Sequence, residues 1–353
     1  MKRIALLGAT GSIGRQALEI IEAHPELELC AASSGSKPVD GLAPLTQVGG
    51  DLTELLERAD PDLVLNAVVG FAGLPATLWA LERGVDLALA NKESLVAAGE
   101  LALDAQRRGG GRLIPVDSEH SAAFQCFEGR EPEQVHSLVL TASGGPFRNR
   151  TRDELSDVAP ADALAHPTWN MGPKITVDSA TLANKGLELI EAHFLFLLPY
   201  DRIEVVVHPS SIVHALVRFR DGAALAHLGY PDMRVPISFA LTYPERGATP
   251  VAPLDLGSGV TLEFHAPDLE TFPLLALARR AGEEGGTAPC VFNAANEVAV
   301  AAFLAGRLPF LGIAEVVADT LVAADGPTAR DVDDLVAADA AARRHAGEAL
   351  KVA

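Results

Sequence analysis

The sequence predicts an α/β fold in which an N-terminal parallel sheet precedes a central α+β domain and a small C-terminal α-helical domain. Three observations predict this order. Strand-like apolar runs alternate with helical periodicity over the first 117 residues, strands joined by tight turns follow, and Ala-rich helical periodicity dominates from about residue 268. The initial alternation favours parallel strands that are covered by helices on both faces.

The first elements form one βαβ unit. Residues 4–7 predict a buried strand, residues 13–23 carry helical spacing that Pro25 stops, and residues 27–32 predict a second strand. Later strands are expected at 63–68, 86–90 and 112–116, and helices at 52–59, 74–83 and 94–108. We assign residues 1–117 to this domain.

The second domain is expected over residues 118–242. Its strands are predicted at 135–142, 204–208, 213–219 and 223–228, and the turn Arg220-Asp-Gly222 indicates an antiparallel pair. A Pro- and Gly-rich stretch predicts a linker over 243–267. Helical patterns such as 293–304 and 313–324 assign residues 268–353 to the third domain.

Composition excludes several classes of protein. The 353 residues carry a formal net charge of −19, which disfavours binding to nucleic acid. The three cysteines have no metal-ligand spacing, which is typical of a reducing compartment. The apolar run after Met1 ends at Gly8, too early for a signal peptide, and no run predicts a membrane span. We therefore expect a cytoplasmic, soluble enzyme.

Three glycines, Gly8, Gly11 and Gly14, separate the first strand from the first helix. Glycines at this place permit a tight turn and a close approach of the backbone to a pyrophosphate, which the helix N-terminus attracts. Inside a βαβ unit this pattern predicts a Rossmann-type dinucleotide-binding domain. The alternative is a glycine turn without a ligand.

The end of the second strand favours NADPH over NADH. An acidic residue there would bind a ribose 2′-hydroxyl, but residues 33–37 read Ser-Ser-Gly-Ser-Lys, and the next carboxylate is Asp40. Hydroxyls and the ammonium of Lys37 suit a 2′-phosphate. The alternative is a solvated loop lysine.

Two carboxylates, Asp117 and Glu119, follow a strand end. If this segment is extended, both point to one side and begin a Mg²⁺ or Mn²⁺ site. Alternatively, they lie in a solvated turn.

A helix offers a third ligand beside an amide and an ammonium, through Asn184, Lys185 and Glu188. The alternative is a surface helix flank with ordinary ion pairs, which we favour for Glu191.

Three further segments indicate ligand contacts. The loop Ser143-Gly-Gly145 follows a strand and leaves backbone N–H groups free for an anion. Lys92 follows another strand end, near the expected nicotinamide. The proline-bracketed segment from His166 to Pro173 is typical of a lid that excludes water. The alternative is a structural loop with a packed Trp169.

Together the motifs resemble one family. They are Gly8-Ala-Thr-Gly-Ser-Ile-Gly14, Ala90-Asn-Lys-Glu-Ser94, Pro115-Val-Asp-Ser-Glu-His120, Ser143-Gly-Gly-Pro-Phe147, His166-Pro-x-Trp-x-Met-Gly172, Val177-Asp-Ser-Ala-Thr-x-x-Asn-Lys-Gly-Leu-Glu188, His208-Pro-x-Ser211, Pro231-Asp-Met-Arg234 and Asn293-Ala-Ala-Asn-Glu297. They occur in the order of the 1-deoxy-D-xylulose 5-phosphate reductoisomerases, which the sequence resembles over all three predicted domains.

This resemblance implies a homodimer that uses NADPH and a divalent metal to rearrange and reduce a phosphosugar, in non-mevalonate isoprenoid biosynthesis. It implies metal ligands at Asp117, Glu119 and Glu188, and catalytic roles for Lys92, Glu119 and His166. It implies substrate contacts through Lys92, Ser118, Glu119, Ser143, His166, Ser179, Asn184, Lys185 and Glu188. The implied cofactor contacts are Thr10, Gly11, Ser12, Ile13, Gly35, Ser36, Lys37, Asn91, Glu93 and Gly172.

The sequence departs from the family at residues 36–60, which are fewer than expected and predict the loss of a strand–helix piece between Lys37 and Leu63. Which of Ser36 and Lys37 takes the 2′-phosphate stays open. Two other functions are also open. One is another NADP oxidoreductase, such as a semialdehyde dehydrogenase with Cys126 as nucleophile; the other is a non-catalytic NADP-binding sensor.

Overall fold

The computed structural model describes residues 1–324, 326 and 328–350, so the last three residues of the predicted helical domain lie outside it. The chain forms two compact units. The first comprises residues 1–95, 99–129 and 227–256, and the second comprises residues 96–98, 130–226 and 257–353. The α/β fold class predicted from the sequence is confirmed.

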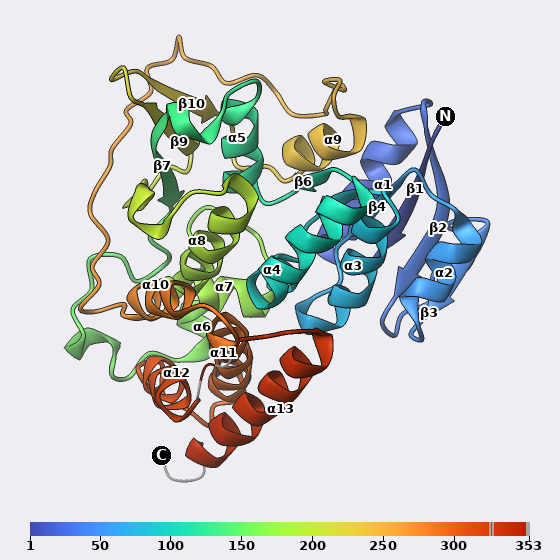
Figure 1. Cartoon of the computed structure of the whole chain (residues 1–353). Helices are drawn as coiled ribbons and strands as arrows, with labels where there is room; N and C mark the ends of the chain where they lie inside the picture. The colour runs from blue at the N-terminus through green and yellow to red at the C-terminus, as the bar shows by residue number, and fades with distance from the viewer. Residues whose placement is uncertain (325, 327, 351–353) are drawn as a thin grey trace. The chain divides into compact units, whose positions relative to one another are not determined.

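The first unit contains a six-stranded sheet in the order β3-β2-β1-β4-β5-β6 (Figure 1). Its adjacent strands are parallel. The chain order reverses beside β1, and the carboxyl ends of strands at such a reversal are where open α/β sheets bind ligands. The strands are β1 (Lys2–Leu7), β2 (Leu27–Ser34), β3 (Leu45–Val48), β4 (Leu63–Asn66), β5 (Asp86–Leu89) and β6 (Leu113–Pro115).

Helices cover both faces of this sheet. On one face Ile4 and Leu63 pack in the same buried cluster as Ile20 of α1 and Ile237 of α9. The alternate residues on the strands, such as Ala5, are equally buried. The helices of this unit are α1 (Ser12–Ala23), α2 (Leu52–Ala59), α3 (Leu74–Glu82), most of α4 (Lys92–Gly109), α5 (Ser118–Phe127) and α9 (Arg234–Thr242), with the 3₁₀ turn η1 (Gly70–Gly73).

The second sheet has the order β10-β9-β7-β8. Strand β7 pairs in parallel with β8 and antiparallel with β9. This mixed sheet agrees with the predicted α+β architecture. Its strands are β7 (Val135–Ala142), β8 (Ile203–Val207), β9 (Val213–Phe219) and β10 (Ala224–Leu228).

The remaining helices belong to the second unit. They are α6 (Pro160–Ala163), α7 (Pro173–Ala180), α8 (Ala183–Phe196), α10 (Leu274–Glu284), α11 (Ala288–Leu304), α12 (Gly312–Ala323) and α13 (Val332–Ala349), with the 3₁₀ turns η2 (Pro132–Gln134), η3 (Asp153–Leu155) and η4 (Tyr200–Arg202). Helices α8 and α10 approach closely, because a Cβ added to Gly186 would lie 2.5 Å from the Cβ of Ala278. Among the described residues, no helix has the length and apolar character needed to span a membrane.

The segment between Lys37 and Leu63 contains one element that was not predicted. It contains strand β3 at the sheet edge and helix α2, so this short segment still supplies one strand and one helix. The prediction included the helix at 52–59 but missed the strand. The strand has only four residues and none of them is fully buried, which explains its weak sequence signal.

Candidate functional site

The glycine loop is shaped by close backbone contacts. Gly8 has a φ of +86°, and a Cβ there would lie 2.6 Å from the carbonyl oxygen of Ala67. A Cβ on Gly14 would lie 2.3 Å from the carbonyl oxygen of Gly8. Larger side chains at these two positions would therefore displace backbone, as expected for a dinucleotide loop.

The N-terminus of α1 is open to an anion. Gly11 is the N-cap, no side chain caps the helix, and the first turn carries no acidic residue. Gly11 and Ser12 are exposed, and Thr10 and Ile13 are half-buried. Unsatisfied N–H groups and the helix dipole favour a phosphate at this position. The four residues predicted to follow the pyrophosphate thus surround a suitable helix end.

The end of β2 lies beside this loop. The carbonyl oxygen of Ser33 accepts hydrogen bonds from the backbone N–H groups of Gly8 (3.0 Å) and Ala9 (2.8 Å). Ser33 Oγ is buried and has no hydrogen-bond partner among the described residues. After β2, Gly35, Ser36 and Lys37 are all exposed, as a contact with a 2′-phosphate requires. The exposure of both side chains leaves either Ser36 or Lys37 able to take that phosphate.

Two buried asparagines organise the carboxyl ends of β4 and β5. Asn66 Nδ2 donates to the carbonyl of Gly73 (2.9 Å) and to Thr77 Oγ1 (3.0 Å). The Asn66 carbonyl accepts from the backbone N–H of Asn91, whose side chain donates to Gly70 O at 2.9 Å. Asn66 was not predicted as a site residue. The sequence pattern that could have predicted it is a polar residue at the end of a strand, at the same sheet edge as Asn91.

Lys92 and Asp117 form a buried ion pair in the first unit. Lys92 Nζ lies 2.6 Å from Asp117 Oδ2, and the two side chains are 8% and 13% exposed. The other oxygen, Oδ1, caps α5 by accepting from the backbone N–H groups of Glu119 and His120. Asp117 therefore fixes the helix start and holds the ammonium at the carboxyl end of β6.

The assumption of an extended segment after Asp117 is wrong, because Ser118 begins helix α5. Oxygens of Asp117 and Glu119 nevertheless lie within 4.8 Å of each other. Ser118 Oγ donates to Glu119 Oε2 at 2.7 Å. Two carboxylates at this separation suit a hard divalent cation, which prefers oxygen ligands.

In the second unit, His166 lies between two serine hydroxyls. Its Nε2 lies 3.0 Å from Ser143 Oγ and 3.1 Å from Ser179 Oγ. Its Nδ1 accepts from the backbone N–H groups of Thr168 (3.1 Å) and Trp169 (2.9 Å). The neutral ring therefore carries its proton on Nε2, directed at the hydroxyls. Burial lowers the pKa of His166, which favours this neutral form.

This arrangement offers hydrogen-bond donors to a phosphate. The loop that carries Ser143 turns through Gly144 and Gly145, both with positive φ, and Gly145 N donates to Ser143 Oγ at 3.1 Å. His166 begins the predicted lid, which is a loop between α6 and α7. Gly172 ends that loop as the exposed N-cap of α7.

Helix α8 brings the third set of predicted residues together. Glu188 is fully buried and accepts hydrogen bonds from the amide of Asn184 and the ammonium of Lys185. The expectation of a surface flank at Glu191 is wrong, since that residue is only 1% exposed. Buried carboxylates are costly unless they are paired or ligate a metal, and the contacts of Glu188 with Asn184 and Lys185 offset that cost.

Glu93, the remaining residue predicted to contact the cofactor, lies in the first turn of α4 and is 8% exposed. Cys126, the nucleophile of the semialdehyde dehydrogenase alternative, is 7% exposed on α5. A catalytic thiolate requires an accessible, electropositive setting. The burial of Cys126 disfavours that alternative.

Family models match most of the chain. The model described as 1-deoxy-D-xylulose 5-phosphate reductoisomerase matches residues 4–48 and 44–99. The C-terminal domain models of the same reductoisomerase match residues 113–196 and 228–345. The two stretches of the first match overlap at residues 44–48, inside the segment that was predicted to be shortened.

Curated relatives carry the same name. The reductoisomerase of Chloroherpeton thalassium is 48% identical over 377 residues, covering 98% of this chain and 97% of its own. That of Mycobacterium avium is 49% identical over 379 residues, covering 99% and 93%. Both alignments are longer than the 353 residues of this chain, so the relatives contain positions that it lacks.

Solved structures agree with the sequence comparisons. The Zymomonas mobilis reductoisomerase in complex with NADPH is 40% identical, with a TM-score of 0.90 and 99% of both chains covered. A DOX-P reductoisomerase in complex with NADPH, fosmidomycin and magnesium is 38% identical, with a TM-score of 0.92, covering 100% of this chain and 99% of the other. From its sequence, its fold and these full-length matches, the chain belongs to the 1-deoxy-D-xylulose 5-phosphate reductoisomerase family.

Proposed function

We propose that this chain converts 1-deoxy-D-xylulose 5-phosphate into 2-C-methyl-D-erythritol 4-phosphate, using NADPH and Mg²⁺ or Mn²⁺, in non-mevalonate isoprenoid biosynthesis. The observation that carries the proposal is the position of His166 Nε2, within 3.1 Å of both serine hydroxyls of a predicted phosphate clamp. Membership of the reductoisomerase family and the ion pair between Lys92 and Asp117 support the roles that we propose for the other site residues.

The site chemistry fits a divalent metal. Asp117, Glu119 and Glu188 would hold it, because they offer three carboxylates and leave positions open for substrate oxygens. When bound, the cation would supply Lewis acidity, and NADPH would supply the hydride. Glycines 8, 11 and 14 and the open N-terminus of α1 would hold the cofactor pyrophosphate.

The protein groups would position and stabilise the substrate. Ser143, Ser179, Asn184, Lys185 and His166 would fix its phosphate, which supplies binding energy remote from the reacting carbons. Lys92 would place its ammonium beside negative charge that develops at the substrate oxygens, and Ser118 would donate a hydrogen bond. The segment from His166 to Gly172 would exclude water once substrate is bound.

The deciding experiment follows NADPH oxidation with 1-deoxy-D-xylulose 5-phosphate and Mg²⁺ or Mn²⁺, with and without EDTA. We expect oxidation that requires the metal, is inhibited by fosmidomycin, and is lost in Glu119→Gln. If the protein binds NADPH but turns over no phosphosugar, it is a non-catalytic sensor and the proposal is wrong. Persistent activity of Glu119→Gln in EDTA would reject the metal role.

We also propose a cytoplasmic homodimer. Strand β10 lies at the edge of its sheet, with Ala224, Leu225 and Ala226 exposed, and an exposed apolar edge is a template for pairing with a second copy. Light scattering after size exclusion tests the dimer, because a monomeric mass at micromolar concentration would reject it. Cell fractionation tests the location.

A further inference from the structure

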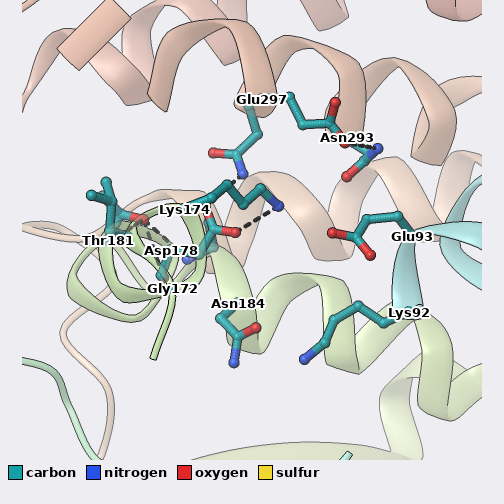
Figure 2. A network of polar contacts seen from close by, with 12 residues as sticks. Lys92, Glu93, Gly172, Lys174, Asp178, Thr181, Asn184, Asn293 and Glu297 are labelled. Atoms are coloured by element: carbon teal, nitrogen blue, oxygen red, sulfur yellow. Dashed lines mark hydrogen bonds and ion pairs between the residues drawn. The ribbon is translucent and has the colours of Figure 1, made fainter. Parts of the chain in front are cut away.

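A buried polar link joins α7, the helix that carries Ser179, to α11 of the same unit. Asp178 immediately precedes Ser179 and is 1% exposed. Its Oδ2 lies 2.7 Å from Lys174 Nζ, and its Oδ1 accepts from Asn296 Nδ2 at 2.8 Å. Figure 2 shows Lys174 and Asp178 joined in this way beside Gly172, at the start of the helix.

The burial and pairing of each group in this link have a physical reason. A carboxylate removed from water destabilises a protein unless both oxygens find partners, and both oxygens of Asp178 have them. Asn296 is itself fully buried in α11, so its amide is a fixed partner. Lys174 lies in the first turn of α7, where the helix dipole disfavours a cation. Its pairing with Asp178, one turn further on, accounts for that position.

The consequence for the site follows from the length of α7. The helix has only eight residues, too few to be stable without tertiary contacts. Its N-cap, Gly172, ends the loop that begins with His166, and its last turn carries Ser179. An anchor at Asp178 therefore fixes the helix between the loop and the serine.

We propose that Asp178 is a positioning residue for phosphate recognition. By bonding to Asn296 of α11 and to Lys174 of its own helix, it holds the hydroxyl of Ser179 against His166 Nε2, where the two groups meet the anion. The proposal rests on the proposed function for the identity of the phosphate ester, but the anion site is tested without turnover.

The test uses the full chain and inorganic phosphate as the probe. Asp178→Asn keeps the shape of the side chain but removes the negative charge that faces Lys174 and Asn296. We expect the calorimetric Kd for inorganic phosphate and the KM for 1-deoxy-D-xylulose 5-phosphate to rise together by about tenfold, as for one lost charge-assisted contact. The Kd for NADPH should change by less than about twofold, because the helix end that meets its pyrophosphate belongs to another unit.

Two further variants separate positioning from simple destabilisation. Thr320→Ala truncates a buried side chain of α12 in the same unit, whose Oγ1 donates to Val316 O at 2.7 Å, and so leaves a cavity. It should lower the Tm without changing the Kd for phosphate. The double variant that carries both Asp178→Asn and Asn296→Asp keeps one carboxylate and one amide between α7 and α11. It should restore most of the phosphate affinity.

The outcomes are distinct. Wild-type phosphate affinity in a folded Asp178→Asn protein overturns the proposal. If that variant does not fold, Asn296→Ala decides, because it keeps the Lys174 pair and removes only the link to α11. A raised phosphate Kd then supports the proposal, and an unchanged value overturns it. A wild-type protein that binds phosphate but does not turn over the phosphosugar refutes the proposed function and leaves this test valid.

Discussion

The ammonium of Lys92 lies 2.6 Å from the carboxylate of Asp117, and both side chains are almost completely buried. The same carboxylate caps helix α5 through its other oxygen. Asp117 thus has one oxygen that caps a helix and one that pairs with Lys92, and these two roles can be separated by substitution.

Asp117→Asn should separate them. Asparagine caps helices about as well as aspartate, so the cap should survive, and any fall in Tm should come from the buried ammonium of Lys92, which loses the Asp117 carboxylate. The loss of charge removes one charged partner of Lys92 and a proposed metal ligand, so kcat/KM should fall by about 100-fold or more. Thermal melting and titration of activity with Mn²⁺ measure both effects. A variant with full activity at low Mn²⁺ would show that Asp117 is no ligand.

Gly14→Ala should disrupt the dinucleotide loop. Its Cβ would lie 2.3 Å from Gly8 O and 2.6 Å from Ala9 Cα, and these backbone atoms have little room to move. We expect a loss of about 1–3 kcal/mol in the free energy of unfolding and weaker NADPH binding. Denaturant unfolding and NADPH fluorescence titration check this result.

Gly347→Ala is the matched control for that substitution. Gly347 lies within α13, and a Cβ there would have no neighbour within 4 Å. Replacing a helical glycine with alanine should stabilise the protein by about 0.5–1 kcal/mol. Equal effects of the two substitutions would contradict the steric argument for the loop.

The stability of the ligand-free protein should depend on His166 at acid pH. Burial lowers the pKa of His166 below its usual value of 6.5, so the unfolded chain binds this proton at a higher pH than the folded chain does. The resulting loss of stability begins as the pH falls through 6.5 and is complete below the folded-state pKa.

The comparison of wild type with His166→Gln isolates this contribution, because His227, whose pKa burial also lowers, is present in both proteins. Urea unfolding between pH 5 and 8 should show a difference that changes only below about pH 6.5. Parallel curves over the whole range would mean that His166 does not titrate differently on folding.

Cofactor preference should reside in Lys37 or Ser36. Lys37→Ala and Ser36→Ala, made separately, should identify the residue that holds the 2′-phosphate. The responsible substitution should lower the ratio of kcat/KM for NADPH over NADH by about tenfold, the effect of one charge-assisted hydrogen bond. An unchanged ratio in the double variant would place the 2′-phosphate elsewhere.

Local sequence signals predicted the first sheet well. The glycine loop, the alternation of strands and helices and the polar residues after strands all depend on neighbours in the chain. The start of α5 was misjudged although Asp117-Ser118-Glu119 is itself an N-cap sequence. Strand β3 was missed because Val48 and its neighbours remain partly exposed and show no apolar run.

Distant contacts explain the other errors. Glu191 has the sequence context of a surface helix flank, but the rest of the second unit buries it. Asp178 and Asn296 lie 118 positions apart, so no local pattern links them. The roles of the individual site residues and the three predicted domain boundaries stay predictions, because they concern bound ligands and division of the chain, not local structure.

The carbonyl of Ser33 has a consequence for engineering the cofactor. Because it accepts from both Gly8 and Ala9, the end of β2, which we propose binds the ribose, is hydrogen-bonded to the loop that we propose binds the pyrophosphate. A shift of the backbone at Ser33 would therefore move both parts of this proposed binding site together. Redesign toward NADH should therefore leave the strand intact and act only on the exposed side chains after Gly35.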